Sequence, residues 1–250
     1  MQHADKQLAL PLADSETGRI PEYSIRISKR AKHLQIKVTP WHGVEVIAAR
    51  RHTKKAIREF VVKNRAWVLD TWEKLKQSYP EAGAAVLPRE LNLLALETCL
   101  AVRYETGGQL KVHQSKASEL VVTSPSKDII LISGGLKKWL MRHARECLAP
   151  RLRNVSQRIG LDFKKTHIRA QKTRWGSCSS NGVISLNYKL LFLPEDLVNY
   201  LMVHELCHTR YMDHSPKYWR LVKQFEPAYR DFEKRLDNAW RYVPMWAHTC

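Results

Sequence analysis

Residues 204–214 read HELCHTRYMDH, which places His204 and His208 four residues apart with a glutamate directly after the first. A helix is expected to begin shortly before, because Pro194 is a favourable first helical residue and two acidic residues follow it in the first turn. The helix expected over 194–209 is apolar on nearly every side, which is typical of a buried helix. The histidines and the glutamate are therefore expected in or near the core, where polar side chains require partners.

A metal ion would satisfy these three side chains together. Residues four apart on a helix stack one turn above another, so the imidazoles of His204 and His208 can reach one Zn²⁺ ion. Glu205 would then lie beside a zinc-bound water and act as its general base, which is the HExxH arrangement. In the alternative interpretation, the two histidines are hydrogen-bonded core residues without a metal.

A third histidine lies just before the next expected helix. His214 precedes Ser215 and Pro216, which predict an N-cap and a first helical residue. The chain must therefore leave the first helix over 209–212, and a return turn would bring His214 over the first two histidines. Three histidine ligands leave a position for water, which is typical of catalytic rather than structural zinc. Alternatively, His214 is a surface histidine near a helix cap.

The N-terminal half predicts β-strands and one helix. Alternating apolar and polar residues predict strands at 23–28, 33–38, 44–48, 99–105, 109–113, 119–124 and 128–133. The first three are expected to form a meander, with a PWHG turn at 40–43. A helix over 54–77, capped by Thr53, and a turn-rich connector at 79–90 separate them from the last four. No internal repeat is evident in the sequence.

The C-terminal half predicts helices around a hairpin. A long helix is expected from about Gly135 to Gly160, because glycine is a favourable residue just after a helix end. Pro150 is expected to kink or break it. The SSNG stretch at 179–182 predicts a hairpin turn with strands on both sides.

These elements divide the chain into three parts. Residues 1–20 are expected to form a flexible tail, 21–134 an antiparallel β-rich module with one helix, and 135–250 a catalytic domain.

The charge of the chain is strongly positive. Its 42 lysines and arginines exceed 24 acidic residues and give a net charge of +18. This excess favours anionic partners such as nucleic acid or nucleotides, although a solvated basic surface would explain it equally well.

Composition also indicates the compartment. The five cysteines are scattered and lack CxxC spacing, which indicates reduced thiols rather than a disulfide framework. No stretch resembles a signal peptide or a membrane span, so a cytoplasmic protein without membrane contact is expected. The oligomeric state cannot be inferred from these patterns.

Three segments carry a resemblance to a known family. TRWGSCSSNGVISLN at 173–187, VNYLMVHELCH at 198–208 and DHSPKYW at 213–219 together resemble the YgjP-like (DUF45) family of predicted zinc metallohydrolases, which is related to the SprT and WLM peptidases. The basic segment ISKRAKHLQIKV at 27–38 and NRAW at 64–67 are also similar to that family.

The resemblance implies an α+β, zincin-like metallopeptidase domain, in which the HExxH helix packs on a small antiparallel sheet. His204, His208 and His214 would bind one zinc ion, and Glu205 would be the catalytic base. Metzincins share this histidine spacing, but they carry a glycine where this chain has Tyr211, and no Met-turn can be assigned.

Other residues could bind the substrate or stabilise the transition state. The candidates are Arg174, Trp175, Asn187, Tyr211 and Tyr218. A structural role in packing or in supporting the hairpin is the alternative for each. Asp213, Glu226 or Asp231 could orient a ligand histidine.

The function favoured by these features is a zinc metallopeptidase acting on a peptide or protein. A metal-dependent nucleotide phosphohydrolase is an alternative, because the positive charge suits an anionic substrate, although the sequence has no P-loop. A second alternative is a nucleic-acid-associated, SprT-like protease. A third is a protein that only binds nucleic acid, with the basic segments at 28–33 and 50–55 contacting phosphates.

Overall fold

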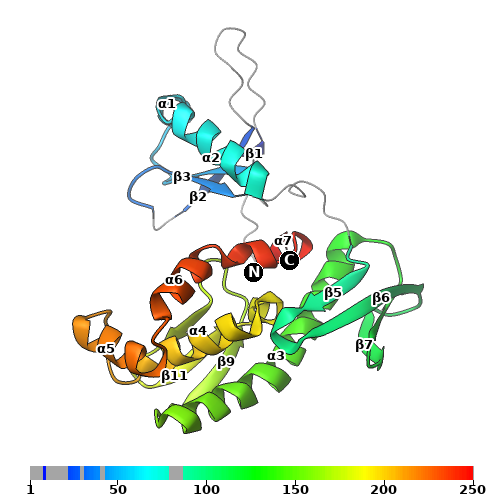
Figure 1. The fold of residues 1–250 in the computed structure, drawn as a ribbon. Helices are drawn as coiled ribbons and strands as arrows, with labels where there is room; N and C mark the ends of the chain where they lie inside the picture. Colours follow the sequence, from blue (N-terminus) through cyan, green and yellow to red (C-terminus); the bar gives the residue numbers. More distant parts are fainter. Residues whose placement is uncertain (1–7, 10–21, 29–30, 40–42, 79–86, 250) are drawn as a thin grey trace. The chain divides into compact units, whose positions relative to one another are not determined.

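The structure, a computed structural model, describes residues 8–9, 22–28, 31–39, 43–78 and 87–249 (Figure 1). The chain divides into two compact units, one reaching to Ala84 and the other running from Ala85 to His248. The expected boundary between residues 134 and 135 falls inside the second unit, because the strands before it pack on the long helix after it. Of the expected tail at 1–20, residues 8–9 form a short strand, and the rest lies outside the described residues.

Unit 1 contains a four-stranded sheet with the order β1-β2-β4-β3. Its strands are β1 (Leu8–Ala9), β2 (Tyr23–Ile27), β3 (Gln35–Thr39) and β4 (Gly43–Ala48). Because β2 pairs with β4 in parallel, the expected antiparallel meander is wrong. β4 suits the interior of the sheet, since Val44, Val46 and Ala48 are all buried. Of the expected PWHG turn, only Gly43 lies within the described residues, and its φ of +64° is one that glycine tolerates.

The helix expected over 54–77 is divided into two. The helices are α1 (Lys54–Lys63) and α2 (Arg65–Ser78). Thr53 caps α1 as expected, since its side chain accepts a hydrogen bond from the Ala56 amide at 3.2 Å. Asn64 ends α1, and its side-chain amide donates to the Phe60 carbonyl at 2.8 Å.

Unit 2 begins with a second four-stranded sheet, which has the order β5-β6-β8-β7. Its strands are β5 (Glu90–Leu93), β6 (Thr98–Thr106), β7 (Lys111–Lys116) and β8 (Glu119–Ser124), with a short 3₁₀ helix, η1 (Leu94–Leu96), between the first two. The pairings repeat those of the first sheet: antiparallel, parallel, antiparallel. The fold therefore contains a repeat that is not evident in the sequence. Of the expected connector at 79–90, residues 79–86 lie outside the described residues.

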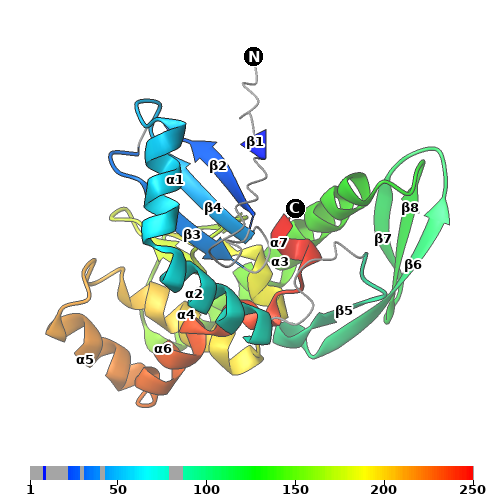
Figure 2. The ribbon, with the colours of Figure 1, turned by 90° about the horizontal axis from the view of Figure 1, so that it is seen from above.

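The strand expected at 128–133 is instead the first turn and a half of α3 (Ile129–Ile159). Asp128 caps this helix by accepting a hydrogen bond from the Ile130 amide at 2.8 Å. Gly160 ends it in a left-handed conformation, as expected. Pro150 lies inside α3 and does not end it. Figure 2 shows the second sheet beside the start of this helix.

A third, small sheet and a set of helices complete unit 2. The sheet has the order β10-β11-β9, with β9 (Lys165–Arg169), β10 (Gly176–Cys178) and β11 (Val183–Asn187). The SSNG residues at 179–182 join β10 and β11 as the expected hairpin, and Gly182 has a φ of +69°. Because β9 and β11 are parallel, the sheet is mixed rather than antiparallel.

The helices that follow are η2 (Tyr188–Phe192), α4 (Glu195–Cys207), α5 (Pro216–Phe225), α6 (Tyr229–Asp237), η3 (Ala239–Tyr242) and α7 (Trp246–Thr249). α4 contacts α3, α5, α6 and β10. Most of its residues are buried, as the apolar pattern predicted. The fold is mixed α+β, and no described helix is both long enough and apolar enough to cross a bilayer.

Candidate metal centre

The C-terminal end of α4 positions two of the three histidines. His204 lies in the last turn of the helix, and His208 is its C-cap. The amides of Arg210 and Tyr211 both donate to the Cys207 carbonyl at 3.1 Å, so the chain turns tightly away from the helix axis. This is the return turn that the sequence predicts between α4 and α5.

The turn brings His214 back over the other two histidines. One ring nitrogen from each of His204, His208 and His214 lies within 4.8 Å of the others. The Nε2 atoms of His204 and His214 are 3.5 Å apart. Two nitrogens bound to one zinc ion at about 2.1 Å, at a tetrahedral angle, would be separated by about 3.4 Å. The cluster therefore has the donor set of a three-histidine metal site, and the His204–His214 pair has the spacing of two ligands of one zinc ion.

The opposite ring nitrogens of the two helix histidines are held by other groups. His204 Nδ1 lies 3.2 Å from Oε1 of Glu233 on α6. His208 Nδ1 donates to the Tyr211 carbonyl at 2.9 Å. A metal-binding histidine commonly donates its second N–H to a carboxylate or a carbonyl, which fixes the ring and leaves Nε2 free for the ion. The His208 ring has this arrangement, whereas His204 Nδ1 faces its carboxylate at a geometry that makes no hydrogen bond.

Glu233 is a residue of this cluster that the sequence patterns did not predict. Besides contacting His204, it accepts a hydrogen bond from the Tyr200 hydroxyl at 2.5 Å. Burial alone would raise the pKa of Glu233, but its interactions with His204 and Tyr200 hold that pKa below its usual value, so the carboxylate stays charged. Of the acids that the sequence offers for this role, Asp213 accepts a hydrogen bond from the Ser215 amide, and Asp231 contacts Lys234.

The sequence did contain a signal for Glu233. On α6, helical spacing puts Glu233 on the same side as Tyr229, Phe232 and Leu236, and all three pack against the core. An acid on the apolar face of an amphipathic helix requires a partner, and His204 and Tyr200 on α4 supply it.

Glu205 is almost fully buried beside the cluster, with 4% of its surface exposed. Its Oε2 atom has no hydrogen-bond partner among the described residues. Burial raises the pKa of Glu205 to about 7, against the opposing charges of His204 and Arg174. A buried carboxyl group with a free oxygen and a pKa near neutrality is suited to accepting and releasing a proton.

Two aromatic residues of α5 support the histidines. Tyr218 is fully buried, stacks on the His208 ring at a centroid distance of 4.5 Å, and donates its hydroxyl to the His204 carbonyl at 3.2 Å. Trp219 stacks on the His214 ring at 5.4 Å. Tyr218 therefore supports two of the three histidines, one through its ring and the other through its hydroxyl.

The remaining candidates have different surroundings. Arg174 is exposed, and its charge acts on Glu205. Tyr211 is 37% exposed, and its backbone carbonyl accepts a hydrogen bond from His208 Nδ1. Trp175 is buried and stacks on Trp240 at 4.0 Å. Asn187 is fully buried, and its side-chain amide holds the 171–174 loop by donating to the carbonyls at both ends.

The chain is similar to one described protein family and, over about a third of its length, to solved structures. A family model described as "YgjP-like, metallopeptidase domain" matches residues 32–239. The crystal structure of the metallopeptidase zymogen of Pyrococcus abyssi abylysin is 27% identical, covers 34% of this chain and 87% of its own, and has a TM-score of 0.32. That of Methanocaldococcus jannaschii jannalysin is 17% identical, covers 34% and 89%, and has a TM-score of 0.31. The curated proteins gave no match. The residues matched by the family model include the three histidines, Glu205 and Glu233.

Proposed function

Since the chain belongs to the YgjP-like metallopeptidase family, we propose that it is a zinc metallopeptidase with a zincin-like catalytic domain, in which Glu205 is the general base. One observation carries this proposal. The imidazoles of His204, His208 and His214 converge beside the buried carboxylate of Glu205, whose Oε2 atom has no hydrogen-bond partner among the described residues. Neutral imidazoles are the ligands that zinc commonly takes in catalytic sites.

A zinc ion held by His204, His208 and His214 would supply a Lewis acid and lower the pKa of water to about 7. The protein's own residues complete the chemistry. Glu205 would accept a proton from the attacking water at Oε2 and pass it to the leaving amine. Arg174 lies close enough to influence Glu205, so its guanidinium is a candidate for stabilising the negative charge on the substrate oxygen.

β10 offers a surface for the substrate backbone. It pairs only with β11 in the described sheet, so its other edge is not covered by a strand. Its first residue, Gly176, lies against Glu205. An extended peptide added at this edge would bring its carbonyl groups past the catalytic carboxylate by β-augmentation.

The proposal is tested by measuring bound zinc and cleavage of a fluorogenic casein together. Glu205→Gln should retain the metal and lose cleavage by about 10²- to 10⁴-fold, the contribution typical of a general base. His204→Ala and His214→Ala should lose both. Glu146→Gln, an exposed acid on α3, is the matched control and should change neither.

Two outcomes would overturn the proposal. In the first, Glu205→Gln cleaves casein as fast as the unmutated protein. In the second, the zinc-loaded protein hydrolyses nucleoside triphosphates in a Glu205-dependent manner and leaves polypeptides intact, which would favour the phosphohydrolase alternative.

A further inference from the structure

Two adjoining cavities lie along α5 and the start of α6, beside the histidine cluster. One has a volume of about 370 Å³ and is lined by His214, Pro216, Trp219, Arg220, Lys223, Tyr229 and Arg230. The other has a volume of about 460 Å³ and is lined by Lys223, Pro227, Ala228, Tyr229, Arg230, Asp231 and Lys234. Because three residues line both, we treat the cavities as one depression, the α5–α6 groove, which reaches a metal-site histidine at one end.

The walls of the groove are strongly basic. Its cations are Arg220, Lys223, Arg230 and Lys234, and its one acid is Asp231, which gives a net charge of +3 (four minus one). Asp231 lies 4.0 Å from Lys234 and compensates only that residue. Among the described residues, Arg220 and Lys223 form no ion pair. A concave surface with unneutralised charges of one sign attracts ligands of the opposite sign.

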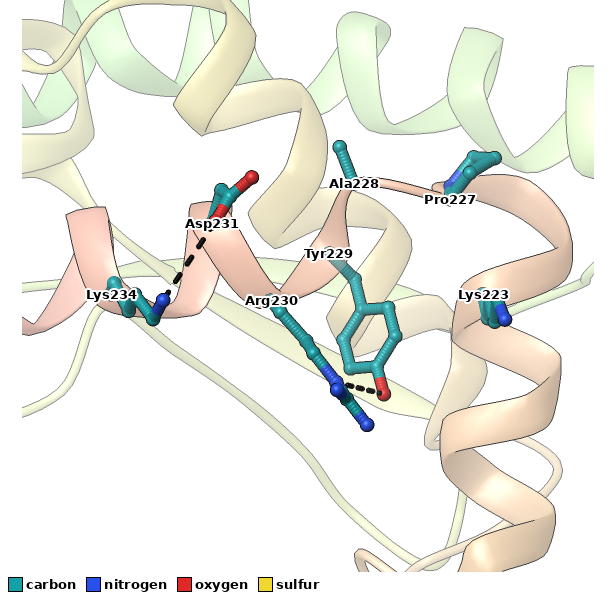
Figure 3. Close-up of a pocket in the computed structure, with 7 residues that line it drawn as sticks. All are labelled: Lys223, Pro227, Ala228, Tyr229, Arg230, Asp231 and Lys234. Atoms are coloured by element: carbon teal, nitrogen blue, oxygen red, sulfur yellow. Dashed lines mark hydrogen bonds and ion pairs between the residues drawn. The ribbon is translucent and has the colours of Figure 1, made fainter.

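The cations stand in two rows on two helices. Arg220 and Lys223 are three residues apart on α5, and Arg230 and Lys234 are four apart on α6, so each pair lies on one face of its helix. Figure 3 shows Tyr229 and Arg230 extending side by side from the start of α6, with Lys223 on the neighbouring α5. Two rows of charges suit an extended chain with several anionic groups better than a single compact anion.

An aromatic column links the groove to the metal site. The Trp219 ring stacks on His214 at 5.4 Å and on Tyr229 at 5.2 Å. The Arg230 guanidinium lies 5.9 Å from the centre of the Tyr229 ring, and its Nε donates to the Tyr229 hydroxyl at 3.3 Å. Arg230 is therefore partly ordered before any ligand arrives, which lowers the entropy lost on binding.

We propose that the α5–α6 groove is a substrate subsite for acidic side chains, so that the protein prefers peptides with glutamate or aspartate on one side of the cleaved bond. This rests on the proposed peptidase function, because a peptide crossing the histidine cluster passes His214, which lines the groove. Successive residues of an extended chain advance by about 3.3 Å, so several of them can lie between the two rows of cations.

The test separates binding from cleavage. Two short labelled peptides are compared, one rich in glutamate and the other with glutamine in its place, and binding to zinc-loaded Glu205→Gln protein is followed by fluorescence anisotropy. Exposed ion pairs are individually weak, so several acting together should give an affinity about tenfold higher for the glutamate peptide. The preference should diminish as salt is added.

Variants assign the effect to the groove. Adding Lys223→Gln and Arg230→Gln should abolish most of the preference and leave the affinity for the glutamine peptide unchanged. Lys217→Gln removes an exposed cation of the same helix that does not line the groove, and it should keep the preference. Equal binding of the two peptides, or a preference that survives the double substitution, would overturn the proposal. So would tight binding of a nucleoside triphosphate that depends on Lys223 and Arg230, with no preference between the peptides.

Failure of the groove and failure of the catalytic proposal can be told apart. Cleavage is followed separately in the unmutated, zinc-loaded protein. If that protein cleaves both peptides and the Glu205→Gln protein shows no binding preference, the acidic subsite alone is refuted. If the Glu205→Gln protein prefers the glutamate peptide and the unmutated protein cleaves neither, an acidic-peptide site is supported and the peptidase function is refuted.

Discussion

A Cβ atom added to Gly176 would lie 2.4 Å from Oε1 of Glu205 and 2.8 Å from its carboxyl carbon. Gly176 begins β10, and Glu205 lies on α4, so the absence of a side chain at residue 176 allows the edge strand to approach the buried carboxylate. This explains why the GSC stretch of the hairpin and the HELCH stretch of the helix form one site although they are far apart in the sequence.

Gly176→Ala should therefore inactivate the protein without removing its metal. The added methyl group must displace the Glu205 carboxylate or the strand, and a displacement of about 1 Å can lower a reaction rate about a hundredfold. Overpacking should also cost about 1–3 kcal/mol of stability. Casein cleavage, bound zinc and urea unfolding measure the three effects. Gly108→Ala is the control, because a Cβ there meets nothing within 4 Å. Full activity in Gly176→Ala would contradict this account of the site.

Glu233→Gln should weaken metal binding. The substitution removes the charge that faces His204 Nδ1 at 3.2 Å, and loss of such a partner typically lowers metal affinity about 10- to 100-fold. Competition with a chromophoric zinc chelator measures the affinity. Asp231→Asn, on the same helix but exposed and paired with Lys234, should leave it unchanged. If both variants bind zinc as tightly as the unmutated protein, Glu233 does not support the ligand.

The histidine cluster could be predicted because its signals are local. His204 and His208 are one helical turn apart, and Ser215 with Pro216 fixes where the next helix begins, so the position of His214 follows from short stretches of chain. Glu233 belongs to a different helix. Its contact with His204 depends on how α6 packs on α4. A single sequence predicts which face of a helix is apolar, but not which other helix that face packs against.

The sheets show the same limit. The alternating patterns located most strands, but the parallel pairs β2–β4 and β6–β8 join strands that are not consecutive, and strand patterns do not specify partners. The apolar run at 128–133 fits either a strand or a helix. The structure has a helix here, and the Asp128 side chain caps its first turn. Ile130 is therefore 84% exposed, whereas a buried strand would have covered this residue.

Arg151 should be important for the stability of unit 2. Its guanidinium joins α3 to α4 by donating to Asn199 Oδ1 at 2.8 Å and to the Glu195 side chain at 2.7 Å, and it also donates to the Ala95 carbonyl at 2.8 Å. Hydrogen bonds to a charged group contribute about 1.5–3 kcal/mol, so Arg151→Ala should lower the free energy of unfolding by about 2–4 kcal/mol once several are lost.

Urea unfolding followed by circular dichroism measures this change. Arg151→Lys should recover only part of it, because an ammonium group cannot reproduce the planar fork that reaches four acceptor atoms. Arg153→Ala, at an exposed site on the same helix, is the control and should change stability by less than about 0.5 kcal/mol. If the Arg151→Ala protein is as stable as this control, the hydrogen bonds of Arg151 contribute nothing to the stability of the protein.

Zinc should stabilise unit 2 selectively, because all three histidines of the cluster lie in it. A ligand that binds only the folded state, at a free concentration a hundred times its Kd, stabilises it by about 2.7 kcal/mol. For a unit of this size, that corresponds to an increase in Tm of about 5–10 °C.

Differential scanning calorimetry with and without zinc should show the shift in one transition, and a chelator should reverse it. His204→Ala should abolish the shift, since two remaining imidazoles hold the ion much more weakly. An equal shift in His204→Ala would instead place the bound zinc elsewhere in the chain.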